Sequence, residues 1–290
     1  MLKFLKVMLN ILIICPINTI FINCKTKKDY TMVIVKNNID KLRVKLYRVT
    51  INKINHTNNI IYFSNHRSYA DFLIDLITTE YCTKYVSRWI VAFYAPIFSF
   101  ISGYFLYDMT IFFKRGGTCI PDFEKLIKKN QIANSGNNIL VYPEGTRRTD
   151  LNYACDLKKG LIYYSYKENC PIQFIISKNK EKMINEKKYT CQKNVDIFVY
   201  YSDVYYPDIQ KYKSMSEYYE YINNEWKTTF NLVYNTDYES KKNEYEQLDI
   251  TKIHDNNYNI DTTKLWIIRI GIISLFTVIP SIFLKYIFSL

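Results

Sequence analysis

The stretch Ile60–Asp71, IIYFSNHRSYAD, decides the fold of this chain. Its apolar start, Ile60–Phe63, predicts a buried strand that ends in a polar turn carrying His66. The segment that begins at Asp71, DFLIDLITTEYC, predicts an apolar helix over residues 71–81. Side chains five positions apart point away from each other on a regular helix. His66 and Asp71 can therefore meet only if His66 lies on the turn and Asp71 within the first residues of the helix.

His66 is singled out among the three histidines of the chain, His56, His66 and His254, because a carboxylate follows it five residues later. An imidazole is the side chain best suited to move a proton near neutral pH. A neighbouring carboxylate can hold its tautomer and stabilise the imidazolium that forms. The spacing alone is weak evidence, since a solvated loop histidine also fits it. His56 and His254 lie in polar surroundings and are assigned no role.

Strands alternate with helices from Ile60 to Tyr234, which predicts an α/β domain with a central, mostly buried sheet flanked by helices. The predicted strands are Ile60–Phe63, Lys84–Ser87, Thr110–Phe113, Ile139–Tyr142, Ile172–Ser177 and Val195–Tyr201. Besides residues 71–81, the predicted helices are Pro121–Lys129 and Met215–Tyr234, and a lysine-rich loop is expected over residues 178–193. The apolar segment Trp89–Tyr107 fits either a membrane span or a pair of helices beside the active site. We favour the pair of helices because the segment lies between two motifs.

Both ends of the chain are apolar enough to suggest N-terminal and C-terminal membrane helices. Residues 1–30 are interpreted as a membrane anchor or a signal-like segment, without a clear small-x-small cleavage site. The main domain is placed at residues 31–234, and its first twenty residues fit an entry strand or an amphipathic surface helix. A polar linker (235–263) follows, and residues 264–290 predict a transmembrane helix whose two basic side chains lie near its ends.

The chain has 290 residues and a formal net charge of +12, which suits an anionic partner such as a membrane surface, a phosphorylated small molecule or nucleic acid. A general bias toward Lys, Asn, Ile and Tyr explains the excess equally well. The seven cysteines form no CxxC pair and have no histidine partner at zinc spacing. Neither a disulfide framework nor a structural metal is indicated, and a reducing environment is expected.

Three polar clusters follow predicted strands: NHRSYAD (65–71), FFKR (112–115) and YPEGTR (142–147). Strand ends of open α/β sheets are where such folds collect their active sites. No GxSxG elbow, P-loop, GxGxxG or metal-ligand cluster competes with them. Arg115 and Arg147 are the natural phosphate ligands, because guanidinium groups bind phosphate through paired hydrogen bonds.

These clusters and one further motif resemble the four ordered motifs of the glycerolipid acyltransferase family, most closely its 1-acylglycerol-3-phosphate (lysophosphatidic acid) acyltransferases. The motifs are Asn65-His66-x4-Asp71, Phe112-Phe113-Lys114-Arg115, Tyr142-Pro143-Glu144-Gly145-Thr146-Arg147 and Cys170-Pro171-Ile172. The second motif departs from the usual pattern, since Met109 and Lys114 stand where the family often has Gly and Asp. Lys114 resembles the lysophospholipid and lysocardiolipin remodelling members, so the resemblance leaves the acyl acceptor open.

The resemblance implies that residues 31–234 form an acyltransferase domain that moves an acyl chain from acyl-CoA to the free hydroxyl of a lysophospholipid, with lysophosphatidic acid expected first. His66, oriented by Asp71, would take the hydroxyl proton. The implied substrate-binding residues are Lys114, Arg115, Glu144, Gly145, Thr146 and Arg147. Glu144 would bond a hydroxyl, fix an arginine, or form a salt bridge with Arg147 or Arg148. No metal or cofactor is expected beyond acyl-CoA as co-substrate.

The implied partners are acyl-CoA, a lysophospholipid and the lipid bilayer, in an integral protein of the endoplasmic reticulum or another intracellular membrane. Lysocardiolipin, lysophosphatidylinositol and glycerol 3-phosphate are the alternative acceptors. A non-catalytic membrane protein of the same fold is a second class of function. A nucleic-acid binder is a third, and it is disfavoured because no binding motif accompanies the positive charge. Tyr69 is expected to pack, and Pro171 to shape the start of a strand.

Overall fold

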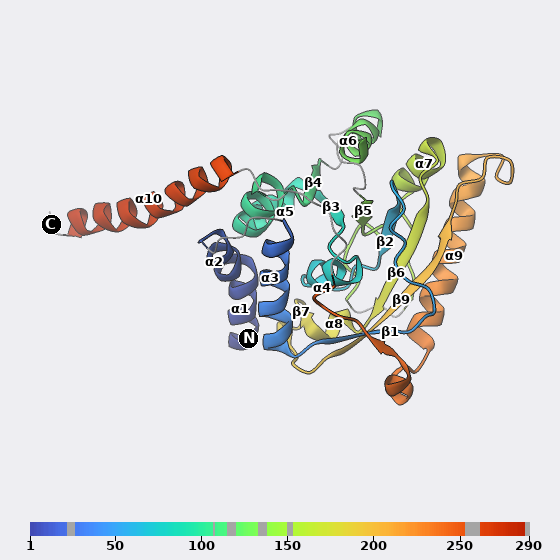
Figure 1. The fold of residues 1–290 in the computed structure, drawn as a ribbon, viewed down its shortest axis with the longest axis horizontal. Coiled ribbons are helices and arrows are strands. Elements are labelled where there is room, and N and C mark those ends of the chain that lie inside the picture. Colours follow the sequence, from blue (N-terminus) through green and yellow to red (C-terminus); the bar gives the residue numbers. More distant parts are fainter. Residues whose placement is uncertain are drawn as a thin grey trace.

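The computed structural model describes residues 1–21, 27–106, 108–114, 120–132, 138–149, 153–252 and 262–287. Within these ranges, eight strands form one sheet in the order β10-β1-β9-β6-β2-β5-β3-β4 (Figure 1). All six predicted strands are present: β2 (Ile61–Ser64), β3 (Thr83–Arg88), β4 (Thr110–Phe113), β5 (Asn138–Val141), β6 (Ile172–Lys178) and β9 (Asp196–Tyr205). The sheet is extended at one edge by β1 (Lys45–Arg48) and β10 (Glu246–Gln247).

The centre of the sheet is parallel and covered on both faces. β2 pairs in parallel with β5 and β6, and its Phe63 lies opposite Val141 and Phe174. All four residues of β2 are buried. Phe63 joins the hydrophobic cluster on one face, whereas its neighbour Tyr62 joins the cluster on the other. A strand covered on both faces is a continuous apolar run, which explains why the sequence Ile60–Phe63 is recognisable.

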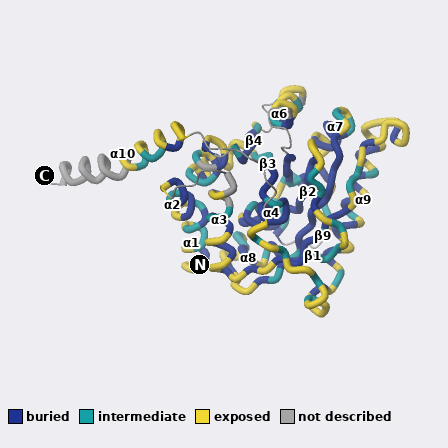
Figure 2. Tube along the Cα trace, viewed as in Figure 1, coloured by how far each residue is buried: buried dark blue, intermediate teal, exposed yellow. Residues whose placement is uncertain are grey.

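Helices cover the two faces (Figures 1 and 2). The cluster on one face includes residues of α3 (Lys27–Leu42) and α4 (Asp71–Thr78). The cluster on the other includes residues of α6 (Ile120–Ile132), α7 (Lys159–Glu168) and α9 (Met215–Asn235). The hydroxyl of Ser214 caps α9 by accepting the backbone N–H of Glu217. The α/β fold with a large central sheet flanked by helices is therefore confirmed.

The N-terminal helices α1 (Leu2–Leu9), η1 (Asn10–Ile14) and α2 (Cys15–Phe21) follow one another without a break. Together they are long and apolar enough to cross a membrane, a property that signal sequences and core helices share. α10 (Thr262–Ile287) extends away from the rest of the molecule (Figure 1). Side chains after Ser274 lie outside the described part of the chain. The membrane span placed at residues 264–290 therefore stays a prediction.

The apolar segment after β3 forms two short helices, α5 (Trp89–Tyr94) and the π-helical η2 (Pro96–Leu106). Pro96 lacks a backbone N–H and begins the second helix, as proline often does. Residues 31–50, for which a strand or a helix was expected, contain both: most of the helix α3 and the whole strand β1.

Three features differ from the expectations. The expected loop 178–193 is wrong as a loop, because it holds α8 (Lys180–Met183) and the hairpin of β7 (Ile184–Asn185) and β8 (Thr190–Cys191). Residues 239–247, inside the predicted linker, form η3 (Glu239–Glu244) and β10, which pairs with β1. The helix α7 was not predicted. Two-residue strands are too short to show a period of their own. β7 exists through its hairpin with β8, and β10 through its pairing with the distant strand β1.

Candidate active site

The polar motifs meet at the end of the sheet where the parallel strands β2, β3, β4, β5 and β6 all finish. The carboxyl ends of these strands therefore point the same way. Residues 65–71 follow β2, residues 142–147 follow β5, and Asn179 and Lys180 follow β6. Lys114 follows β4, three strand positions from β2. At the usual strand spacing this places the end of β4 roughly 14 Å from the end of β2.

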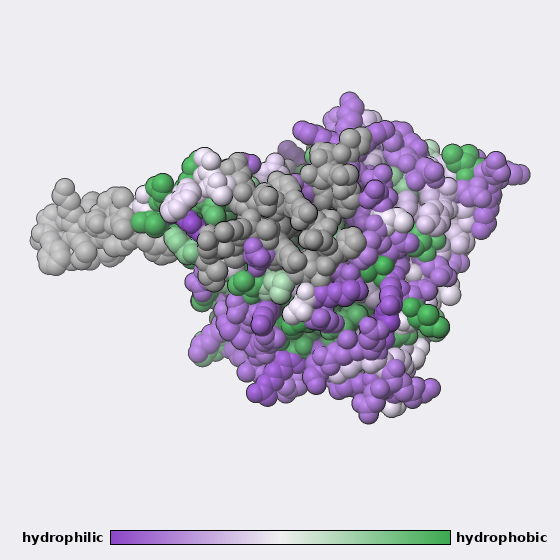
Figure 3. Space-filling model, in the orientation of Figure 1, coloured by the Kyte–Doolittle hydropathy of each residue, from purple (hydrophilic) through white to green (hydrophobic). Residues whose placement is uncertain are grey.

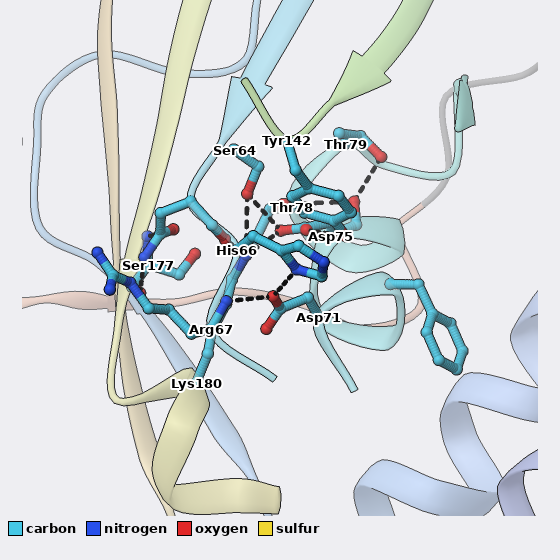
Figure 4. Close-up of polar contacts among 12 residues, drawn as sticks. Ser64, His66, Arg67, Asp71, Asp75, Thr78, Thr79, Tyr142, Ser177 and Lys180 are labelled. Carbon is cyan, nitrogen blue, oxygen red and sulfur yellow. Dashed lines mark hydrogen bonds and ion pairs between the residues drawn. The ribbon is translucent and has the colours of Figure 1, made fainter. Parts of the chain in front are cut away.

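His66 and Asp71 form the hydrogen-bonded pair that the sequence predicts. The Nδ1 atom of His66 lies 2.8 Å from Oδ2 of Asp71 (Figure 4). His66 is on the turn and Asp71 is the first residue of α4, which resolves the problem of their spacing. The same Oδ2 accepts the backbone N–H of Arg67 at 2.5 Å. The imidazole also stacks on the ring of Tyr142, with centroids 4.2 Å apart and planes 12° from parallel.

The surroundings of this pair favour a neutral histidine beside an ionised aspartate. Burial lowers the pKa of His66, and the nearby charge of Arg147 adds to this, against the opposing effect of Asp71. Burial of Asp71 works to raise the pKa of its carboxyl, but the charge of Lys180 and the bond to His66 outweigh it, so the pKa is lowered. His66 is 22% exposed, so a substrate can reach its ring. The geometry suits a general base.

A second buried network lies beneath the pair and was not foreseen from the sequence. The ammonium of Lys180 donates to Oδ1 of Asp75 at 2.5 Å and to Oγ of Ser64 at 2.9 Å. The hydroxyl of Tyr142 donates to Oδ2 of Asp75 at 2.8 Å. Lys180 and Asp75 have no exposed side-chain surface. Since Tyr142 contacts both Asp75 and His66, the network supports one face of the imidazole.

The turn 142–147 is tied directly to the His66 turn. The backbone N–H of Arg148 donates to the carbonyl of His66 at 2.9 Å, and that of Gly145 donates to the carbonyl of Tyr142 at 3.1 Å. Gly145 has a φ of +76°, a conformation that strains any residue with a Cβ. A Cβ there would also lie 3.2 Å from the side chain of Lys158. The glycine is therefore required by the shape of this turn.

Glu144 is buried beside Arg67, not paired with Arg147. Its Oε1 lies 3.7 Å from Nη2 of Arg67, and neither carboxylate oxygen accepts a hydrogen bond from any described residue. Burial raises the pKa of Glu144 to about 7, although Arg67 and Arg148 oppose this. Arg67, which was not among the predicted site residues, is itself buried against the ring of Phe230, 4.5 Å from its centroid.

Arg147 is held in a fixed orientation at the surface of the site. Its Nε lies 2.9 Å from Oε1 of Glu186, and its guanidinium lies over the ring of Tyr69 at 3.5 Å. Tyr69 was expected only to pack, but it is a platform for this arginine. Thr146 and Lys114 are exposed. Arg115 lies outside the described residues.

The structure thus gathers His66, Asp71, Glu144, Gly145 and Arg147 in one place and sets Lys114 apart. Of the two remaining histidines, only His56 lies in the described part of the chain, and it is outside this cluster. His56 precedes β2 at the opposite edge of the sheet and contacts Glu80, and His254 lies outside the described residues. Among the residues that are described, no group of three or more His, Cys, Asp or Glu side chains could hold a metal.

A model of the acyltransferase family matches residues 46–178, which include all five residues of this cluster. Residues 46–178 are an acyltransferase-family domain. The acyltransferase family that the sequence motifs indicate is therefore confirmed. The matched region extends from β1 to β6 and includes the His66 turn and the turn 142–147.

Among solved structures, the fold is similar to that of the 1-acyl-sn-glycerophosphate (LPA) acyltransferase PlsC from Thermotoga maritima. The two share 15% sequence identity with a TM-score of 0.56, over 81% of this chain and 95% of that one. At this identity the similarity concerns the fold. No curated protein matches the sequence.

Proposed function

We propose that this acyltransferase is a membrane-bound enzyme that moves an acyl chain from acyl-CoA to the free hydroxyl of a lysophospholipid, with lysophosphatidic acid as the preferred acceptor. The observation that carries the proposal is the His66–Asp71 pair, with an imidazole nitrogen 2.8 Å from a buried carboxylate oxygen, inside the region that matches the acyltransferase family. The apolar helices Leu2–Phe21 support attachment to a membrane.

In the proposed reaction, His66 takes the proton of the acceptor hydroxyl through Nε2 while Asp71 stabilises the imidazolium. The hydroxyl oxygen forms a bond to the thioester carbonyl carbon, and the carbon–sulfur bond then breaks. CoA leaves as a thiolate and receives the proton from the imidazolium. Bonds and protons balance without a covalent enzyme intermediate, a metal or a further cofactor.

Arg147 is the proposed ligand of the acceptor phosphate. Its contacts with Tyr69 and Glu186 fix the guanidinium plane before substrate binds, which reduces the entropy lost on binding. Glu144, Gly145 and Thr146 shape the turn that presents it. Lys114, which follows β4, is proposed to bind a more distant part of the acceptor or of CoA. Arg115, which lies outside the described residues, is proposed to act with it.

A second candidate function has the same reaction but a different acyl acceptor. Lys114 is exposed after β4 and stands in place of the acidic residue common in the second motif, as in remodelling enzymes that take lysocardiolipin or other lysophospholipids. A panel of lysophosphatidic acid, lysophosphatidylinositol and lysocardiolipin with one labelled acyl-CoA separates these acceptors. The expected order places lysophosphatidic acid first.

The decisive experiment is acyl transfer by the purified full chain in detergent. His66→Ala should lower turnover by about 10²–10⁴-fold, the usual contribution of a general base. His56→Ala is the matched control, because His56 also contacts a carboxylate but lies at the opposite edge of the sheet. A non-catalytic membrane protein would show no transfer at all, and equal activity in the His66→Ala variant would refute the proposed mechanism.

A further inference from the structure

The helices α5 and η2 present apolar side chains to solvent. All residues of α5 except Ala92 are exposed, and Phe93 and Tyr94 are each 78% exposed. We call the following exposed residues the α5–η2 face: Trp89, Ile90, Val91, Phe93, Tyr94, Phe100, Tyr104 and Phe105. A helix that faces water normally carries polar side chains on that side. A contiguous exposed apolar patch marks an interaction surface.

This face adjoins the active site. α5 begins directly after β3, at the edge of the sheet that carries His66. Phe72, the neighbour of Asp71, packs on Phe98 of η2 with ring centroids 4.4 Å apart. Trp89 stacks on Phe112, two residues before Lys114, at 4.9 Å. An occupant of the face would therefore lie beside the helix that holds Asp71.

The same side of the molecule carries the segments suited to a membrane. η2 contacts η1 and α2, which belong to the stretch long enough to cross a bilayer. Arg269 of α10 donates through Nε to the carbonyl of Ile20 at 2.7 Å, and Lys264 lies over the ring of Phe105. Further exposed apolar residues surround the start of α10 (Figure 3): Trp266, Ile267, Ile270 and Ile273.

A lipid bilayer is the occupant that fits this arrangement. Three apolar segments that are distant in sequence lie in contact here: η2 contacts η1 and α2, and α10 contacts α2. Trp and Tyr side chains, which have an apolar body and a polar tip, are enriched where protein meets the membrane interface. The nearby cations Lys114 and Lys264 suit the anionic headgroup layer.

We propose that the α5–η2 face inserts into the bilayer interface, so that a lipid acceptor enters the site from the plane of the membrane. The first half of the proposal concerns binding alone. The second half rests on the proposed acyl transfer to a lysophospholipid. The two halves are therefore tested separately.

Fluorescence of Trp89 tests insertion without any need for activity. The chain has three tryptophans, and Trp226 is fully buried while Trp266 is on α10. In the full chain carrying Trp266→Phe, vesicles of phosphatidylcholine brominated on its acyl chains should quench Trp89, and the additional change Trp89→Phe should remove that quenching. The variant that also carries Trp89→Phe retains only Trp226 and gives the background quenching. If quenching with Trp89 present is no greater than this background, the proposal is overturned. Trp89 shielded from aqueous iodide but not quenched by brominated lipid would also overturn it, since a protein partner would then cover the face.

Kinetics test the route of the acceptor. In the double variant Phe93→Ser and Tyr94→Ser, the apparent KM for long-chain lysophosphatidic acid in vesicles should rise about tenfold or more, because two apolar groups are lost from the interface. The KM for a short-chain, monomeric lysophosphatidic acid should not change. Tyr206→Ser, an exposed tyrosine beyond the end of β9, is the matched control and should change neither value. An equal rise for both acceptors would refute the route, whereas absent activity in the parent chain would refute only the proposed function.

Discussion

Asp71→Asn tests whether the carboxylate acts through its charge on His66. Oδ2 of Asp71 meets two donors, the His66 ring and the backbone N–H of Arg67, so the amide oxygen of the variant must take its place. The amide NH₂ then occupies the position of Oδ1, which is buried and has no hydrogen-bond partner among the described residues. The variant should therefore keep the orientation of the ring while losing the negative charge.

The magnitude follows from these two changes. A hydrogen bond to a charged group contributes about 1.5–3 kcal/mol, so loss of charge beside the forming imidazolium should lower kcat by about 10- to 100-fold. The buried NH₂ without an acceptor should cost about 1–3 kcal/mol of folding stability. The pKa of His66 should fall further, because both the hydrogen bond and the charge of Asp71 now raise it. The acid limb of the rate profile should thus move to lower pH while its plateau drops.

The assay is acyl transfer across the acid range at a temperature where the variant is folded. Asp75→Asn is the matched control, since Asp75 is equally buried one turn later on α4 but bonds Lys180 and Tyr142 and does not contact His66. That control should lose stability without moving the acid limb downward. The reasoning fails if Asp75→Asn reproduces both the fall in kcat and the shift, or if Asp71→Asn leaves the limb in place.

Three further changes test the surrounding residues. The pKa of Glu144 is about 7 in the folded chain, against 4.5 in the unfolded chain. Between these pH values the carboxyl is protonated only in the folded chain, so the free energy of unfolding falls as the pH rises. Glu144→Gln cannot ionise, so its free energy of unfolding, measured with denaturant, should rise relative to that of the parent over this pH range, by up to about 3 kcal/mol at pH 8. If the stability of both proteins changes equally with pH, Glu144 is not a buried acid with a raised pKa. Tyr142→Phe should keep kcat within about threefold, because the stack on His66 remains, but should lower unfolding stability by about 1–3 kcal/mol, because Asp75 loses a donor. Arg147→Lys should raise the KM for lysophosphatidic acid about tenfold with little change in kcat, and an unchanged KM would place the phosphate elsewhere.

The residues that sequence reasoning located share a local signal. β2 could be predicted because a strand buried on both faces must be apolar throughout. α9 could be predicted because its buried residues recur at helical spacing, at Tyr218, Ile222, Trp226 and Phe230. His66, Asp71 and the turn 142–147 could be placed together because parallel strands deliver their following residues to one edge. For these parts of the site, the order of elements along the chain was sufficient.

The residues that were missed act through contacts distant in sequence. Lys180 is one lysine in a lysine-rich stretch, and only the pairing of β6 with β2 brings it to Ser64 and Asp75. Arg67 stands between the two catalytic candidates, yet its buried neighbours Glu144 and Phe230 lie far along the chain. A lysine or arginine in sequence is ordinarily a solvated charge, so burial of either requires partners that no local pattern reveals.

The cations around His66 couple substrate binding to the strength of the base. The charge of Arg147 lowers the pKa of His66 in the free protein, and the proposed acceptor phosphate would sit on that same charge. A bound phosphate offsets the charge, so the pKa of His66 should rise when the lysophospholipid is in place and the imidazole becomes a stronger base. The acid limb of kcat, which reports the complex, should then lie at higher pH than that of kcat/KM, which reports the free enzyme. The difference should shrink for an uncharged monoacylglycerol acceptor. Coincident limbs for both acceptors would mean that the phosphate binds too far from His66 to act on it, which would remove Arg147 from the proposed headgroup site.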